Sequence, residues 1–223
     1  MTSDAAHKQK ELARDELRAI VTFARSLDRA ALAAPSLCTG WRIDDVLAHL
    51  AWTATAPLGT LARAMLLGGL RPGPRMASHF GRAAVEHRQT HAIGEIIDTL
   101  NELAQGARAY GMGARIGRPR EYLVDYVVHH ADIRRALGKP APVLNERTIA
   151  ALDAAPTIGG LIGGKQRSRG LRLLATDTDW VRGTGPTIEG PAEMLLLGIT
   201  GRPAALSELE GEGVAVLAGR IGG

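Results

Sequence analysis

The stretch Arg120–Lys139 reads REYLVDYVVHHADIRRALGK, and its spacing predicts a buried helix. At 3.6 residues per turn, Asp125, His129 and Asp132 fall on one narrow stripe. Apolar side chains such as Val128 occupy most of the remaining circumference. A helix that is apolar on nearly every side is one that the rest of the chain covers.

Two carboxylates and an imidazole inside such a helix are costly unless they have a strong partner. A divalent metal ion is a suitable partner, because it turns their lone pairs into bonds. The alternative is that the stripe faces water beside Glu121. Arg134 and Arg135 argue against it, since a solvated face usually collects nearby charges and these two fall off the stripe.

Composition limits both the core and the class of partner. The chain has 223 residues, of which 45% are hydrophobic but only 4% aromatic, so the core must consist mainly of Ala, Leu, Val and Ile. Its net charge of +4 is spread along the chain, without a Lys/Arg block or interleaved aromatics. We therefore expect no nucleic-acid partner.

The sequence also indicates where the protein acts. The N-terminal residues MTSDAAHKQKELARDEL lack the apolar core of a signal peptide. The longest apolar run, Ala54–Leu70, is interrupted by Pro57, Gly59 and Arg63, so no membrane span is expected. A soluble, cytoplasmic protein follows as the expectation.

Helical periodicity predicts a bundle in the first two thirds of the chain. Connectors are expected at Asp28–Thr39, Gly68–Ser78 and Tyr110–Arg118. The expected helices are Asp4–Leu27, one from Trp41 to Pro57, His79–Gln105 (continuous or broken near Thr90), the Arg120 helix up to Gly138, and Asn145–Ala155.

The composition and pattern of the sequence change after Thr157. A Gly/Arg-rich linker precedes a strand candidate in GLRLLATDTDW, a turn plus strand in VRGTGPTIEG, and a helix that opens at Pro191. We therefore predict a metal-binding helical bundle at residues 1–157 and a small α/β domain at residues 158–223, docked on the bundle.

Facing helices of a bundle can build one metal site. The predicted ligands are His49 from the second helix with Asp125 and His129 from the fourth. Two imidazoles and one carboxylate leave open positions on the ion, as in catalytic sites. Asp132 and Asp45 are predicted to orient the two imidazoles from behind.

Two motifs resemble a known family. GWRIDDVLAHL and DYVVHHADIRRALG are similar to the second-helix and fourth-helix motifs of the mycothiol-dependent maleylpyruvate isomerase family. That family belongs to the DinB-like superfamily of up-down four-helix bundles. The tail, from GLRLLATDTDW through GPAEMLLLGITGRPAAL, resembles the small C-terminal domain that many members carry.

The resemblance implies a site and an activity. The family's metal ligands, which usually hold zinc, fall on His49, Asp125 and His129, although the characterised isomerase has Glu where this chain has Asp125. Arg202 is the match to a catalytic arginine, which would pair with a carboxylate of the substrate or thiol. The implied function is a mycothiol-dependent transferase or isomerase acting on a small electrophile, as a monomer or homodimer.

Two other functions remain open from the sequence. The bundle can serve as a metal-binding or ligand-binding module without turnover. It can also be a metal-dependent hydrolase, in which the open position binds water instead of a thiol.

Further histidines are weighed as ligands. His87 and His91 lie one helical turn apart, but their polar neighbours indicate a solvated region or a helix break. His130 points about 100° away from His129 and is interpreted as a packed or hydrogen-bonded side chain.

The remaining residues of interest are interpreted as structural. Trp41 and Trp52 are assigned to the core or to a pocket wall. Cys38, the single cysteine, excludes a disulfide framework and is interpreted as a small buried hydrophobe.

Overall fold

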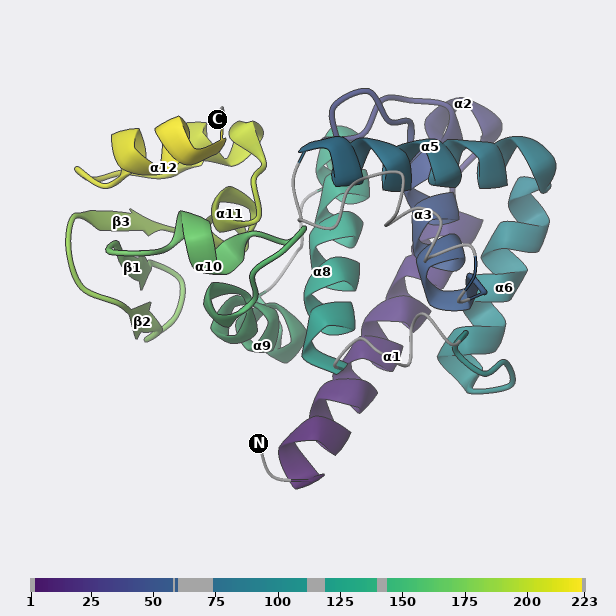
Figure 1. The fold of residues 1–223 in the computed structure, drawn as a ribbon, viewed down its shortest axis with the longest axis horizontal. Coiled ribbons are helices and arrows are strands. Elements are labelled where there is room, and N and C mark those ends of the chain that lie inside the picture. The colour runs from purple at the N-terminus through teal and green to yellow at the C-terminus, as the bar shows by residue number, and fades with distance from the viewer. Residues whose placement is uncertain (1–2, 58, 60–73, 112–118, 140–143, 222–223) are drawn as a thin grey trace.

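A computed structural model describes residues 3–57, 59, 74–111, 119–139 and 144–221 (Figure 1). The fold is mainly helical with a small C-terminal sheet, which confirms the predicted fold class. In order, the elements are α1 Ser3–Arg25, α2 Arg29–Leu32, α3 Ile43–Thr55, α5 Pro74–Thr90, α6 Ile93–Gln105, α8 Pro119–Ala136, α9 Glu146–Ala154, η1 Ala155–Thr157, α10 Gly164–Arg167, β1 Arg172–Ala175, β2 Val181–Arg182, β3 Thr187–Gly190, α11 Ala192–Ile199, η2 Pro203–Glu208 and α12 Val214–Ile221.

The bundle consists of α1, α3, α6 and α8, with α5 lying across α3 (Figure 1). Helix α6 shows why these segments pack. Its buried residues Ile96, Ile97, Leu100 and Leu103 recur at three- and four-residue intervals, so they form one apolar face. The opposite face stays polar and exposed.

Helix α8 is buried on almost every side, as its sequence predicts. Asp132 has no exposed surface, and His129 retains 7% of its accessible area. The alternative reading, a stripe that faces water, is therefore wrong for these two residues. Asp125 remains 24% exposed because it opens into a cavity.

The connectors differ in part from the prediction. The chain breaks between α5 and α6 at His91–Ala92, which confirms a break near Thr90. The loop predicted at Gly68–Ser78 is wrong from Pro74 onward, since α5 begins there and proline favours the first helical position. Residues 68–73 and 112–118 lie outside the described residues.

A short helix interrupts the predicted connector at Asp28–Thr39. In α2, the Asp28 carboxylate accepts a hydrogen bond from the Ala31 backbone N–H at 2.7 Å, which caps the helix. This turn leads the chain to Cys38 and Trp41, just before α3.

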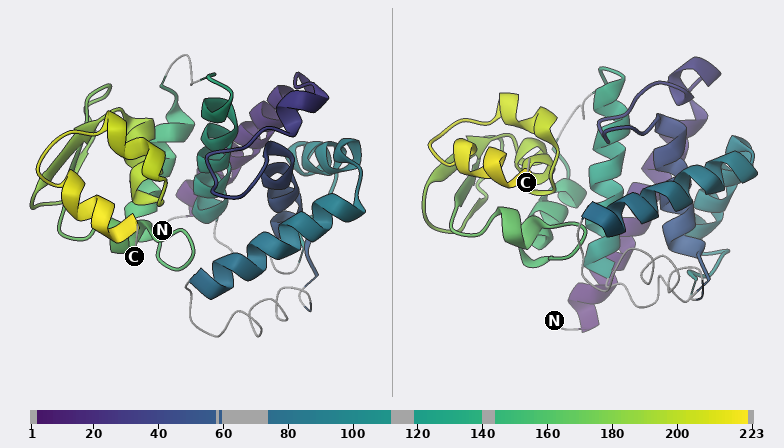
Figure 2. Two further views of the ribbon diagram at one scale, coloured as in Figure 1. Left: turned by 90° about the horizontal axis from the view of Figure 1, so that it is seen from above. Right: turned by 45° about the horizontal axis from the view of Figure 1, so that its top comes forward.

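The C-terminal unit lies beside α8 and α9 in both views of Figure 2. Its sheet has the order β2-β1-β3, with β1 antiparallel to β2 and parallel to β3. Helix α11 is buried along its whole length. One apolar cluster includes both Ala155 and Ile158, so the domain boundary after Thr157 stays a prediction.

Within the described ranges, none of the helices combines the length and the hydropathy that crossing a bilayer requires. Residues 60–70 of the apolar run near Ala54 fall outside those ranges.

Candidate metal centre

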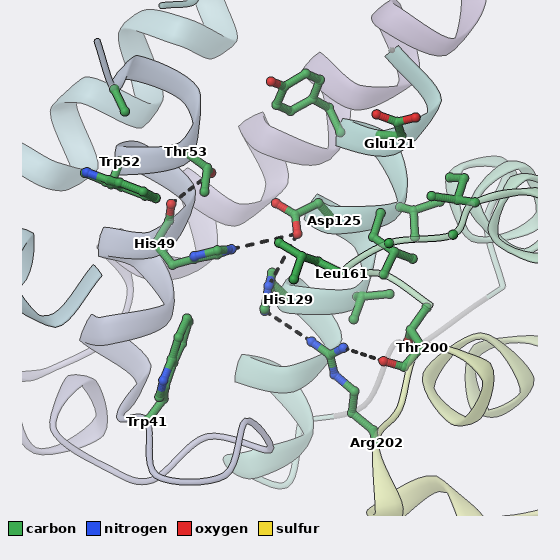
Figure 3. A pocket seen from close by; sticks show the side chains of 18 residues that line it. Trp41, His49, Trp52, Thr53, Glu121, Asp125, His129, Leu161, Thr200 and Arg202 are labelled. Carbon is green, nitrogen blue, oxygen red and sulfur yellow. Dashed lines mark hydrogen bonds and ion pairs between the residues drawn. The ribbon is translucent and has the colours of Figure 1, made fainter. Parts of the chain in front are cut away.

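Helices α3 and α8 bring the three predicted ligands together (Figure 3). His49 comes from α3, while Asp125 and His129 lie one turn apart on α8. The distance from Asp125 Oδ1 is 3.9 Å to His49 Nε2 and 3.5 Å to His129 Nε2. One potential ligand atom from each residue lies within 4.8 Å of the others.

These separations fit a shared cation. Atoms that bind one tetrahedral zinc ion at 2.0–2.1 Å lie roughly 3.3 Å from each other. The His129–Asp125 distance of 3.5 Å is close to this value and the His49–Asp125 distance of 3.9 Å is longer, and both exceed a good hydrogen bond. Two imidazoles and a carboxylate also form a donor set that suits zinc and leaves room for a further ligand.

The imidazole of His129 is held from behind. Its Nδ1 lies 3.0 Å from Asp132 Oδ2, so the carboxylate fixes the ring and leaves Nε2 facing Asp125. The predicted role of Asp132 thus matches its position. A carboxylate behind a metal-binding imidazole orients the ring and increases its basicity.

The predicted partnership of Asp45 with His49 is wrong. Asp45 Oδ2 accepts a hydrogen bond from the Arg42 backbone N–H at 2.9 Å, because Asp45 lies in the first turn of α3, where N–H groups need acceptors. His49 Nδ1 is buried and has no hydrogen-bond partner among the described residues. Burial lowers the pKa of His49, although Asp125 opposes the shift, so the ring is neutral and able to bind a metal.

The buried charges stabilise one another. Burial alone would raise the pKa of Asp125, but the interactions with His129 and His49 outweigh it and lower that pKa. The pKa of Asp132 is likewise lowered, because Arg202 and His129 outweigh burial. Both carboxylates are therefore ionised at neutral pH.

Arg202 joins the C-terminal unit to this centre. Its Nη2 and Nε donate to Asp132 Oδ2 at 2.7 and 3.2 Å, and its Nη1 donates to the Thr200 carbonyl at 3.0 Å. Asp132 raises the pKa of Arg202 against the effect of burial. The guanidinium lines the cavity but is already paired with a carboxylate.

Cys38 contacts the carboxylate behind this centre, which the sequence reasoning missed. The thiol is half-buried and donates to Asp132 Oδ2 at 3.0 Å, with His129 Nδ1 at 3.6 Å and Arg202 Nη2 at 3.7 Å. The interpretation as a buried hydrophobe is therefore wrong. No local signal marks this residue, because its partners lie on α8 and near η2.

A cavity of about 730 Å³ opens over the three candidate ligands. Trp41 stacks on His129 with a ring-centroid distance of 6.3 Å, and it also contacts His49. Trp41 and Trp52 both line the cavity, which confirms the pocket-wall interpretation. The cavity walls also include residues 158–162, so the C-terminal side of the chain contributes to it.

The other histidines lie apart from this centre. His130 Nδ1 is 2.5 Å from Glu16 Oε1, which confirms its interpretation as a hydrogen-bonded side chain. The rings of His87 and His91 are in contact at a tilt of 37° at the end of α5, where the helix breaks.

Known proteins resemble this chain in sequence and in fold. The sequence profile of the mycothiol maleylpyruvate isomerase N-terminal domain matches residues 13–134, more than half of the chain. The chain belongs to that family. The matched range of the mycothiol maleylpyruvate isomerase N-terminal domain contains His49, Asp125 and His129 and ends before Arg202.

Two solved structures resemble the chain over 93% of its length and 92% of theirs. A histidine-to-alanine mutant of the mycothiol-dependent maleylpyruvate isomerase has a TM-score of 0.58 at 13% identity. A further crystal structure of the mycothiol-dependent maleylpyruvate isomerase has a TM-score of 0.49 at 14% identity. At such identities the first likeness establishes the fold. No curated protein sequence matches the chain.

Proposed function

We propose that this protein is a metal-dependent thiol transferase or isomerase that uses mycothiol and acts on a small electrophile. One observation supports the proposal above the others: His49 and His129 both direct Nε2 at Asp125 Oδ1 beside an accessible cavity. Membership of the mycothiol maleylpyruvate isomerase N-terminal domain family favours a thiol as the further ligand.

Charge balance favours a thiolate. An imidazole that binds a metal is neutral, so two of them with one carboxylate would leave a net positive charge on a bound divalent ion, which one thiolate would neutralise. Zinc held by these three residues would lower the pKa of the cofactor thiol, so that the nucleophilic thiolate persists at neutral pH.

The chain's own residues supply orientation and a partly dry environment. Asp132 fixes the His129 ring, and Arg202 fixes Asp132 in turn. Trp41 covers both imidazoles on one side and excludes water there. Arg202 is proposed to act through Asp132, and a ligand carboxylate, which the sequence predicts as its partner, would have to compete with that pairing.

Metal analysis tests the proposal directly. Protein purified without added metal and then loaded with zinc should retain about one ion per chain, whereas His49→Ala and Asp125→Asn should retain far less. His91→Ala is the matched control, because His91 lies apart from the centre. The absence of retained zinc in the unmodified protein would overturn the proposal.

The reaction class needs a second measurement. Zinc-loaded protein should accelerate formation of an adduct between a thiol and a small electrophile. Acceleration of ester hydrolysis without any thiol dependence would instead indicate a hydrolase. Zinc retention with neither activity would indicate a binding module.

A further inference from the structure

We infer that the electrophile is a small, uncharged and largely apolar molecule rather than a dicarboxylate. This inference rests on the proposed function and specifies its substrate class. It follows from three features of the cavity: its apolar lining, the distribution of charges on its walls, and the position of Leu161.

The walls near the candidate ligands are mainly apolar. Aromatic and aliphatic side chains come from the loop before α3, from α3, from α8 and from residues 158–162. The apolar lining residues are Trp41, Trp52, Ala56, Val124, Val128, Ile158, Leu161 and Ile162. An apolar ligand surface gains free energy when it leaves water for such walls.

The charges on the walls disfavour a dianion. Among the described lining residues, Arg202 is the permanent cation, and Asp132 already neutralises it. Asp125 lines the same cavity, and its carboxylate together with one bound thiolate would balance a divalent ion. A dicarboxylate would then find no unpaired cation among the described lining residues and would lose its hydration without compensation.

Leu161 marks the side of the cavity where the ligand would enter. It is 45% exposed, although most large apolar residues in the described ranges are covered. It projects toward the cavity from the C-terminal side, opposite His49 (Figure 3). A ligand with an apolar face would cover this side chain on binding, whereas a carboxylate placed there would lose its hydration without gaining a partner.

The reaction on such a substrate is balanced without another reactant. For an α,β-unsaturated ketone, the thiolate sulfur forms a bond to the β-carbon while the carbon–carbon π bond breaks. The electron pair moves to the enolate oxygen, and water returns a proton to the α-carbon. Uncharged acceptors of this kind fit the cavity better than their dicarboxylate counterparts.

Two unreactive probes separate binding from catalysis. Cyclohexanone represents the uncharged class and succinate the dianionic class. Of the three tryptophans, Trp41 and Trp52 line the cavity and Trp180 does not, so their indole N–H signals in ¹⁵N spectra report binding with an internal control. Cyclohexanone should shift the Trp41 and Trp52 signals at concentrations at least tenfold lower than succinate, while the Trp180 signal stays fixed.

Substitution at the cavity edge completes the test. Leu161→Arg should weaken cyclohexanone binding about tenfold, the effect of losing a few apolar contacts. It should also strengthen succinate binding. Val181→Arg is the matched control, because Val181 is 51% exposed on β2 and does not line the cavity. Succinate binding as tight as cyclohexanone binding would overturn the inference, as would the absence of any shift at Trp41 and Trp52 with cyclohexanone.

A thiol and a reactive electrophile distinguish failure of this inference from failure of the proposed function. Zinc-loaded protein with 2-mercaptoethanol should favour 2-cyclohexen-1-one over maleate by at least tenfold. A preference for maleate would overturn the inference and leave the thiol chemistry intact. Absence of both adducts would overturn the proposed function, while the indole signals would still decide the substrate class.

Discussion

At the scale of single residues, one carboxylate connects the parts of the candidate centre. Asp132 accepts hydrogen bonds from Cys38 and Arg202 and faces His129 Nδ1, and it has no exposed surface. Such contacts are worth little on a surface but matter when buried, because removing one partner leaves an uncompensated charge. We therefore expect this residue to be the most sensitive position outside the three candidate ligands.

Replacing Asp132 should weaken zinc binding without removing a ligand. Asp132→Asn should lower zinc affinity about 10–100-fold, because residues behind a ligating imidazole have effects of this size. Competition with a chromogenic chelator measures the affinity, and circular dichroism confirms that the variant is folded. A folded Asp132→Asn protein with unchanged affinity would contradict the role assigned to this carboxylate.

At the scale of elements, α5 packs against a wall of the cavity. A methyl group built on Gly81 would lie 3.2 Å from Trp41 Cζ2, closer than most real contacts. Trp41 in turn stacks on His129. By contrast, nothing lies within 4 Å of the same position on Gly94 of α6.

The two glycines therefore form a matched pair. Gly94→Ala should raise the free energy of unfolding by roughly 0.5 kcal/mol, because alanine loses less backbone entropy in a helix. Gly81→Ala should raise the free energy of unfolding by less than this amount, or lower it, because Trp41 must move. It should also alter the Trp41 indole signal. Chemical denaturation measures both effects. Equal stabilisation by the two substitutions would contradict the tight packing of α5 on Trp41.

A buried carboxylate ties α1 to α8 and α9. Glu16 binds His130 and Arg147, each at 2.5 Å. Burial would raise the pKa of Glu16, but these two partners outweigh it and lower that pKa below its ordinary value of 4.5. The stability that Glu16 contributes is thus present above pH 4.5 and is lost as the pH falls through the lower, folded-state pKa.

Glu16→Gln should reveal that contribution. It should cost about 3 kcal/mol at pH 7, because it removes the buried carboxylate that His130 and Arg147 share. The difference from the unmodified protein should shrink as the pH falls below 4.5. Asp15→Asn is the control, since Asp15 pairs with Arg18 on the surface and should contribute about 0–1 kcal/mol. A difference that stays constant down to pH 3 would exclude the assigned titration.

The sequence predicted those elements whose pattern is local. Apolar spacing was sufficient for α3 and α8, and the pairing of His49 with Asp125 and His129 followed from placing facing helices side by side. Contacts between distant loops were not predictable in this way. Cys38 meets Asp132 only because the connector folds back over α8, and Leu161 reaches the cavity only because the C-terminal unit docks beside it.

At the scale of the whole molecule, ion pairs join the C-terminal unit to the bundle. Arg134 and Arg135 of α8 both bind Glu193 of α11, which retains 7% of its accessible surface. Arg135 also binds Glu208, whose side chain is 47% exposed. The same guanidinium therefore has one buried and one exposed partner.

Glu193 and Glu208 should contribute very different amounts to the free energy of unfolding. Glu193→Gln should lower the free energy of unfolding by about 3 kcal/mol, because it leaves the covered guanidinium of Arg134 without a counter-charge and Arg135 with only the exposed Glu208. Glu208→Gln should cost about 0–1 kcal/mol. Denaturant titration of both variants measures the difference. Equal effects would mean that the junction between α8 and α11 does not depend on buried charge.

The pairing of Asp132 with Arg202 carries an evolutionary consequence. Asp132 lies on α8 behind the candidate ligand His129, and Arg202 precedes η2 in the C-terminal unit. Either charge alone would be costly in that interior, so natural relatives should keep or replace both positions together. Lineages that have shed the C-terminal unit should therefore carry an uncharged residue at position 132, or supply a cation to it from another segment.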